Sequence, residues 1–216
     1  MTESAGSFVV LASGRGSNFQ AIIDRIADRY IPATCSALIT DNPDALAIKR
    51  ATEAGIPIEV VNFRSFAGKE QYEAALIAAI ERYEPALVVL AGYMRILGPG
   101  IVRAYAGRMI NIHPSLLPSF PGLHAQAQAI TYGVKVAGCT VHFVTDEMDA
   151  GPVIIQRTVP VMDGDDADRL SDRILEQEHQ AFPEVIKLWF EKKLSVEGRR
   201  VIISESGNGA SAPRER

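Results

Sequence analysis

FVVLASGRGSNFQAIIDRI, residues 8–26, joins a strand, a tight turn and a helix in one short stretch. Its first part, Phe8–Ala12, is apolar without interruption, which predicts a strand covered on both faces of a sheet. The turn Ser13–Asn18 follows directly and contains two glycines. Apolar residues then recur at helical spacing, at Phe19, Ile22, Ile23 and Ile26. A buried strand that leads straight into an amphipathic helix is the first half of a strand–helix–strand unit with parallel strands.

The same alternation of strand and helix continues to residue 113. The expected strands are Phe8–Ala12, Thr34–Ile39, Pro57–Val61, Ala86–Leu90 and Met109–His113, and the expected helices are 17–29, Ala45–Ala54, Glu70–Tyr83 and Ile101–Tyr105. This order predicts an α/β fold: a mostly parallel twisted sheet with helices on both faces, Rossmann-like in its N-terminal half. Ligands of such sheets bind beyond the carboxyl ends of the strands, near the change in strand order. We therefore expect the chemistry after the first, fourth and fifth strands.

The second half is organised differently. Residues 114–123 carry three prolines and a glycine, which predicts a rigid loop in which one X-Pro bond is a candidate for the cis form. A helix His124–Tyr132 and two strands, Val136–Phe143 and Val153–Val159, are expected next. A long amphipathic helix, Leu170–Lys192, contains Pro183, which we expect to kink or interrupt it. A small hairpin, Leu194–Val196 with Arg199–Ile203, precedes a segment, 204–216, that we expect to be disordered.

The composition excludes several classes of protein. Hydrophobic residues make up 47% and charged residues 22% of the chain, which are ordinary globular values. The net charge of −4 argues against a nucleic-acid-binding protein. The longest apolar stretch, Ala86–Met94, is about half of a membrane span, and residues 1–7 do not resemble an export signal. Cys35 and Cys139 suggest reduced, buried thiols in a cytoplasmic protein, and the four histidines lack the spacing of a metal site.

The turn Ser13–Asn18 is a candidate phosphate site. Free backbone N–H groups at a helix N-terminus attract anions, and Gly16, Ser17 and Asn18 open the first helix. The dinucleotide fingerprint is incomplete, since Phe19 stands in place of its third glycine, and no P-loop lysine is present. The alternative is an ordinary strand-to-helix turn.

Asn111 and His113 form the sharpest candidate for catalysis. Residues two apart on a strand point to the same side, so an amide and an imidazole project together while Ile112 points to the opposite face. Asn can donate to an oxygen that becomes negative, and His can donate or accept a proton near neutral pH. The acidic loop 145–152 could bring a carboxylate to His113 and favour the charged imidazole. The alternatives are a strand end with a hydrogen-bonded histidine and a solvated acidic turn; His142 is expected to be a satisfied core histidine or to support the site from behind.

The stretch Ala91–Leu97 follows the fourth strand and mixes apolar residues with Arg95. This mixture suits a flat, partly apolar ligand whose polar edge needs donors. A connector that merely covers the edge of the sheet explains the composition equally well.

Five stretches together resemble the phosphoribosylglycinamide formyltransferase family. They are SGRGSN (13–18), AGYMRIL (91–97), NIHPSLLPSFPGLHA (111–125), GCTVHFV (138–144) and DEMDAGPVI (146–154). The resemblance implies the formyltransferase fold and transfer of a formyl group from the co-substrate 10-formyltetrahydrofolate to the amine of glycinamide ribonucleotide, in purine biosynthesis. It implies one domain, 7–195, with a nucleotide-binding half, 7–113, and a folate and catalytic-loop half, 114–195.

The resemblance also implies roles for individual residues. The catalytic residues would be Asn111, His113 and Asp149; the ribonucleotide would be bound by Gly16, Ser17, Asn18 and Glu178; the folate would be bound by Lys69, Met94, Arg95, Ile96, Leu97 and Asn111. Gln126 and Leu175 depart from the family pattern and receive no role. We expect no metal, nucleic-acid or membrane partner, and the apolar strand edges suggest a homodimer.

Three other functions compete with this one. A 10-formyltetrahydrofolate deformylase usually carries an N-terminal regulatory module, and the formyltransferase that acts on initiator tRNA carries a basic C-terminal domain; we expect neither here. A non-catalytic nucleotide-binding module would explain the sheet and the glycine turn. It would not require Asn-x-His at a strand end with an acidic loop downstream.

Overall fold

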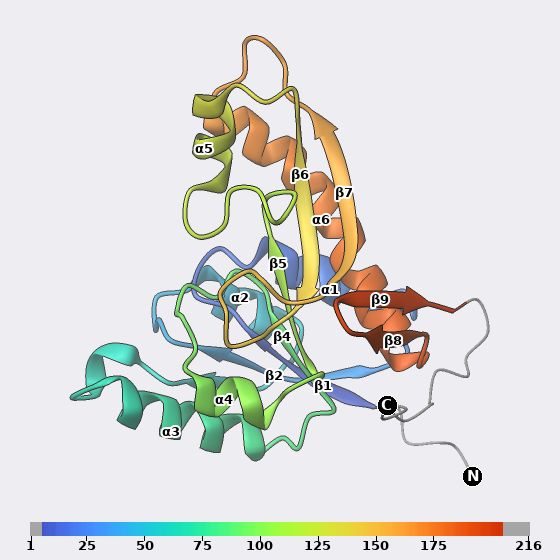
Figure 1. Cartoon of the computed structure of the whole chain (residues 1–216). Helices are drawn as coiled ribbons and strands as arrows, with labels where there is room; N and C mark the ends of the chain where they lie inside the picture. The colour runs from blue at the N-terminus through green and yellow to red at the C-terminus, as the bar shows by residue number, and fades with distance from the viewer. Residues whose placement is uncertain (1–5, 205–216) are drawn as a thin grey trace.

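A computed structural model describes residues 6–204 and shows a nine-stranded sheet in the order β3-β2-β1-β4-β5-β6-β7-β9-β8 (Figure 1). The strands are β1 Ser7–Leu11, β2 Thr34–Thr40, β3 Ile58–Val60, β4 Leu87–Leu90, β5 Met109–His113, β6 Val136–Phe143, β7 Val153–Pro160, β8 Leu194–Glu197 and β9 Arg200–Ile203. The strands β3, β2, β1, β4 and β5 pair in parallel, whereas β6 pairs antiparallel with both β5 and β7. The expected α/β fold with a mostly parallel sheet is confirmed for the N-terminal half.

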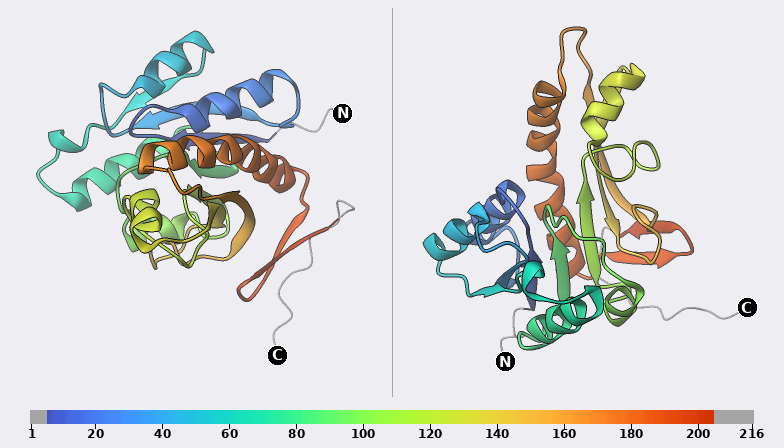
Figure 2. Two further views of the ribbon diagram at one scale, coloured as in Figure 1. Left: turned by 90° about the horizontal axis from the view of Figure 1, so that it is seen from above. Right: turned by 90° about the vertical axis from the view of Figure 1, so that its left-hand side faces the viewer.

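Helices cover both faces of the parallel part. The helices of the described residues are α1 Ser17–Ala27, α2 Leu46–Glu53, α3 Lys69–Glu81, α4 Pro99–Ala104, α5 Ala125–Tyr132 and α6 Ala167–Phe190, with a 3-10 turn η1 at Phe63–Ser65. Alternate residues of β1 face opposite layers: Phe8 and Val10 pack in the core that contains α1, α2 and α6, while Val9 and Leu11 pack in the core that contains α3 and α4. Figure 2 shows α6 running alongside α1, in agreement with their contacts. The uninterrupted apolar runs of the sequence follow from this two-sided burial.

The order of the strands reverses between β1 and β4. From β1 the chain moves outward through β2 and β3, and it then returns to the other side of β1 to form β4 and β5. The segments that follow β1, β4 and β5 therefore lie together at the carboxyl ends of these parallel strands, beside the reversal of strand order.

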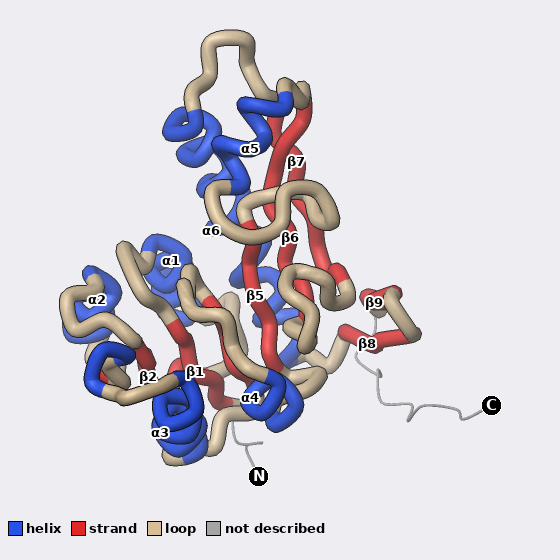
Figure 3. Tube along the Cα trace, turned by 60° about the vertical axis from the view of Figure 1, so that its left-hand side comes forward, coloured by secondary structure: helices blue, strands red, loops and turns tan. Residues whose placement is uncertain are grey.

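The C-terminal half forms an antiparallel extension of the sheet. The long strands β6 and β7 and the helices α5 and α6 project beyond the parallel strands (Figure 3). The expected interruption of the last helix is wrong, since α6 continues through Pro183 from Ala167 to Phe190. Ala181, Phe182 and Pro183 are buried, and this packing offsets the one hydrogen bond that proline removes.

The hairpin β8–β9 is confirmed and joins the same sheet, through one parallel pairing of Val153 with Arg200. The sheet thus extends past residue 195, and the domain division at residue 113 stays a prediction. Of the segment expected to be disordered, residues 205–216 lie outside the described residues. Ser204 is described, and its backbone N–H donates to the carbonyl of Lys193.

Both cysteines are buried as free thiols. Burial raises the pKa of Cys35 and of Cys139 to about 12, so neither thiol is a nucleophile at neutral pH. Within residues 6–204, no helix is long and apolar enough to cross a bilayer. The same residues contain no cluster of three or more His, Cys, Asp or Glu side chains that could hold a metal ion.

Candidate active site

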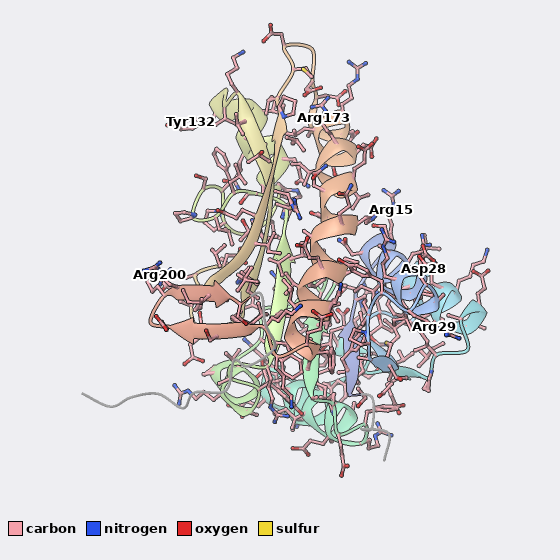
Figure 4. All side chains as sticks on the ribbon, turned by 90° about the vertical axis from the view of Figure 1, so that its right-hand side faces the viewer. Arg15, Asp28, Arg29, Tyr132, Arg173 and Arg200 are labelled. Carbon is pink, nitrogen blue, oxygen red and sulfur yellow. The ribbon has the colours of Figure 1, made fainter. Side chains whose placement is uncertain are left out.

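The loop 13–18 is held tightly against α2. Gly16 precedes α1 in the left-handed conformation with φ 67°, and a Cβ at Gly16 would lie 2.8 Å from the Cβ of Ala47. Only glycine meets both requirements without strain. The N–H of Ala47 donates to the carbonyl of Gly14 at 3.1 Å, and Nε of Arg50 donates to the carbonyl of Arg15 at 2.9 Å. The loop thus presents the backbone N–H groups at the start of α1, and Figure 4 shows Arg15 beside that end of the helix.

Asn18 connects the start of α1 to α6. Its Nδ2 donates to Oε2 of Glu178 at 2.7 Å, and both side chains are buried. Burial raises the pKa of Glu178, while the hydrogen bond from Asn18 partly opposes that shift. The structure therefore places the predicted ribonucleotide residues together: Gly16, Ser17 and Asn18 at the helix terminus, with the Glu178 carboxylate beside them. One N–H of the Asn18 side chain is thus already used by Glu178.

The segment that follows β4 has a fixed backbone and exposed apolar side chains. The N–H of Met94 donates to Oγ of Ser13 at 2.9 Å. Arg95 pairs with the buried Asp41 at 2.6 Å, and its guanidinium lies 4.1 Å from the centre of the Phe63 ring. The side chains of Met94 and Ile96 are 61% and 68% exposed. This segment offers a firm apolar surface, as a flat ligand requires.

Lys69 lies at the start of α3. Its Nζ is 3.6 Å from Oε1 of Glu73, and that same oxygen accepts a hydrogen bond from the backbone N–H of Gly98 at 2.6 Å. Lys69 is therefore linked to the far end of the 91–98 segment through one carboxylate. A role in binding the folate stays a prediction.

Asn111 and His142 face each other across the β5–β6 pair. Nδ1 of His142 lies 2.9 Å from the carbonyl of Phe143, which can only accept, so Nδ1 carries the proton. Burial lowers the pKa of His142, which keeps the ring neutral and leaves Nε2 as an acceptor. Nε2 lies 3.2 Å from Nδ2 of Asn111, so one N–H of Asn111 donates to it and the other remains available to a substrate. The interpretation of His142 as a buried histidine with satisfied hydrogen bonds is confirmed, while its support of a catalytic site stays a prediction.

His113 and Asp149 are in contact. Nδ1 of His113 lies 3.5 Å from Oδ2 of Asp149, and both side chains are almost fully buried. Oδ1 of Asp149 lies 3.8 Å from Nε2 of His142, so the carboxylate sits between the two imidazoles. The acidic loop therefore does bring a carboxylate to the histidine, and the alternative of a fully solvated turn is wrong for Asp149.

The proline-rich loop contacts both of these groups through its backbone. Nε2 of His113 lies 2.9 Å from the carbonyl of Phe120, and the N–H of Gly122 donates to Oδ2 of Asp149 at 2.8 Å. Both nitrogens of His113 thus face protein oxygens. A substrate oxygen can accept a hydrogen bond from His113 only if it displaces one of these two oxygens. One of them, the carbonyl of Phe120, lies in a loop and not in the sheet.

The base of this loop is held by two strands. Oγ1 of Thr140 donates to the carbonyl of Ser115 at 2.6 Å and accepts from the N–H of Leu117 at 3.0 Å. Nε2 of Gln156 bonds both to Oγ1 of Thr140 and to the carbonyl of Leu117. The Leu117–Pro118 bond is cis, as the proline content suggested. Residues 115–118 are therefore fixed by β6 and β7. Farther along the loop, the Phe120 ring packs against Tyr132 of α5, and Nε2 of Gln128 donates to the carbonyls of Pro121 and Leu123. This part of the loop is thus attached to α5 as well as to His113 and Asp149.

Comparison with known proteins shows which family the chain belongs to. Residues 7–186 match the family model described as formyl transferase. The chain belongs to the formyl transferase family. It is 49% identical over 184 residues to phosphoribosylglycinamide formyltransferase of Escherichia coli (strain K12), covering 85% of this chain and 86% of the relative. It is 44% identical over 180 residues to the enzyme of the same name from Bacillus subtilis (strain 168), covering 83% and 92%.

Solved structures of the family agree with the fold. Glycinamide ribonucleotide transformylase 1 from Symbiobacterium toebii superposes with a TM-score of 0.91 at 45% identity, covering 94% of this chain and 95% of that one. A formyltetrahydrofolate deformylase from Pseudomonas syringae pv. tomato superposes with a TM-score of 0.86 at 28% identity, and the match covers 92% of this chain but only 65% of the deformylase. The formyl transferase fold is thus shared with the deformylase, while sequence identity favours the transferases.

Two contacts of this candidate site cannot be predicted from the sequence. The carbonyl of Phe120 and the N–H of Gly122 are backbone groups, and no residue type marks them in advance. Ser13 was recognised only as part of the glycine turn, although its hydroxyl contacts Met94. Gln126 lies 3.5 Å from Ser171 of α6, and Leu175 is half-buried on the same helix; neither contacts Asn111, His113 or Asp149.

Proposed function

We propose that the chain transfers the formyl group of 10-formyltetrahydrofolate to the amine of N1-(5-phospho-D-ribosyl)glycinamide. The products are the N2-formyl ribonucleotide and tetrahydrofolate, in purine biosynthesis. The observation that carries the proposal is the contact of His113 with Asp149, beside Asn111, at the same sheet edge as the start of α1. The family supplies the reaction class, and its high-identity relatives act on this ribonucleotide by name.

The ribonucleotide would bind at the start of α1. The N–H groups of Ser17 and Asn18 suit its phosphate because they belong to the positive end of a helix. The buried Glu178 carboxylate, held by Asn18, suits a hydroxyl group of the ribose, which would donate to it.

Formyl-folate would bind against the segment 91–97, with Met94 and Ile96 providing apolar contact. The amine of the ribonucleotide attacks the formyl carbon, and the formyl oxygen becomes negative. The free N–H of Asn111 and the Nε2–H of a protonated His113 donate to that oxygen, the latter after replacing the carbonyl of Phe120. Asp149 faces Nδ1, orients the imidazole and stabilises its positive charge.

Collapse of this intermediate completes the transfer. The bond from carbon to the folate nitrogen breaks as the formyl C=O re-forms. The attacking nitrogen loses one proton and the departing folate nitrogen gains one, through Asp149 or a water molecule beside it. Protons and charge balance, and no metal or redox group takes part in the step.

One titration separates this function from its rivals. Purified protein is mixed with 10-formyltetrahydrofolate, with and without the ribonucleotide, while tetrahydrofolate is followed by absorbance and formate by a coupled assay. We expect tetrahydrofolate to form only when the ribonucleotide is present, without release of formate. Turnover to formate without the ribonucleotide would indicate a deformylase, and binding without turnover would indicate a nucleotide-binding module.

We place this reaction in the cytoplasm, where reduced thiols such as Cys35 and Cys139 are ordinary. The homodimer stays a prediction that sedimentation at several protein concentrations would test.

A further inference from the structure

Ser13 joins three segments at the reversal of strand order. It lies just after β1, separated from Leu11 by Ala12, and is almost fully buried. Its N–H donates to the carbonyl of Gly92 at 3.1 Å, and its carbonyl accepts from Nδ2 of Asn42 at 3.2 Å. Its Oγ accepts from the N–H of Met94 at 2.9 Å. The ends of β1, β2 and β4 therefore meet at one residue.

The hydroxyl makes the one contact among these that depends on the residue type. Any residue at position 13 would keep its backbone bonds to Gly92 and Asn42. The bond to Met94 needs an oxygen on Cβ, and without it the partly buried N–H of Met94 loses its acceptor. Gly92, two residues earlier, has a φ of +73°, so the chain turns sharply just before the held amide. The hydroxyl thus fixes the direction in which the segment leaves that turn.

We propose that Ser13 is a positioning residue for formyl-folate, although it lies inside the motif that opens the ribonucleotide site. Its Oγ holds the backbone of Met94 and thereby sets where the exposed side chains of Met94 and Ile96 stand. This inference rests on the proposed function, in which those side chains form the folate surface. The same bond couples the two substrate segments, because the loop 13–18 and the segment 92–97 share it.

Two serines of the one loop provide a matched test. Ser13→Ala removes the acceptor for Met94, whereas Ser17→Ala removes a hydroxyl at the start of α1. We expect Ser13→Ala to raise the KM for formyl-folate by about 5- to 10-fold, the effect of one lost hydrogen bond, with the ribonucleotide KM changed less than about 2-fold. Ser17→Ala should give the opposite split. A general loss of stability would change both KM values or kcat instead.

Amide hydrogen exchange adds a readout that does not need activity. The N–H of Met94 should exchange at least about 5-fold faster in Ser13→Ala than in the wild type, while that of Gly98, held by Glu73, keeps its rate. If Ser13→Ala does not fold, Ser13→Cys replaces it, since sulfur is a weak acceptor of similar size.

A raised ribonucleotide KM in Ser13→Ala, equal rises in both KM values, or an unchanged formyl-folate KM would each overturn the inference. The proposed function is tested separately by the wild-type rate. If the wild type transferred no formyl group, tetrahydrofolate binding by calorimetry would replace KM; equal affinity in the wild type and Ser13→Ala would again overturn the role of Ser13.

Discussion

The loop after β1 and the loop after β5 use hydrogen bonds in opposite ways. At the loop 13–18, side chains from other elements hold the backbone, as Arg50 holds the carbonyl of Arg15. At the proline-rich loop, the backbone holds reactive side chains, as the carbonyl of Phe120 faces His113 and the N–H of Gly122 donates to Asp149. The first arrangement leaves a binding surface ready. The second places loop backbone against His113 and Asp149, and in the proposed mechanism a substrate oxygen replaces the carbonyl of Phe120 at His113. In the proposed function, the ribonucleotide thus binds at a loop whose backbone is held by side chains, and the chemical step occurs at side chains that are held by the backbone of another loop.

The largest effect is expected from His113→Asn. This change removes one of the two proposed donors to the formyl oxygen, so kcat should fall by about 10²- to 10³-fold with little change in the ribonucleotide KM. Steady-state kinetics with both substrates varied would measure it. His124→Asn is the control, because His124 is exposed at the N-cap of α5 and its replacement should keep kcat within about 2-fold. A kcat close to that of the wild type in His113→Asn would remove the histidine from the mechanism.

An intermediate effect is expected from Thr140→Val, which tests whether the base of the proline-rich loop is fixed. The change leaves the carbonyl of Ser115 and the N–H of Leu117 without their partner, and the free energy of unfolding should fall by about 2 kcal/mol. Urea denaturation would measure it. Thr158→Val on β7 is the control: Thr158 is exposed, and its change should stay within about 0.5 kcal/mol. Equal small changes in both variants would show that Thr140 does not hold the loop.

The smallest effect is a pH dependence at Glu178 of α6, which bonds Asn18 at the start of α1. Because burial raises the pKa of Glu178 above its ordinary 4.5, the folded protein binds this proton more tightly than the unfolded chain. Stability is then lost as pH rises from 4.5 through the folded pKa, and the cost persists at higher pH. Glu178→Gln keeps an acceptor for Asn18 and should gain stability relative to the wild type at pH 7.5 but not at pH 4. Urea denaturation at the two pH values would measure this, and a difference between the proteins that does not change with pH would contradict it.

Much of this fold follows from local patterns. The apolar runs Phe8–Ala12 and Ala86–Leu90 identify strands buried on both faces, and Met109–His113 and Val136–Phe143 were placed with their bounds as observed. The interruption predicted at Pro183 is wrong because the hydrogen bond that proline removes destabilises the helix less than the packing of the buried residues around it stabilises it. In the candidate site, the two-residue spacing of Asn111 and His113 on a strand predicts that their side chains point to the same side. The partner carboxylate lies far along the chain, and the carbonyl of Phe120 has no sequence signature at all.

The central claim is that Asp149 holds His113 in position for the chemical step, and a single-turnover measurement tests it most directly. Wild type and Asp149→Asn are each saturated with both substrates, and the rate of formyl transfer is followed by rapid quench. The account predicts a rate at least about 10²-fold lower in Asp149→Asn, with dissociation constants for tetrahydrofolate and for the ribonucleotide within about 3-fold of the wild type. Formyl transfer by Asp149→Asn at the wild-type rate would contradict the account.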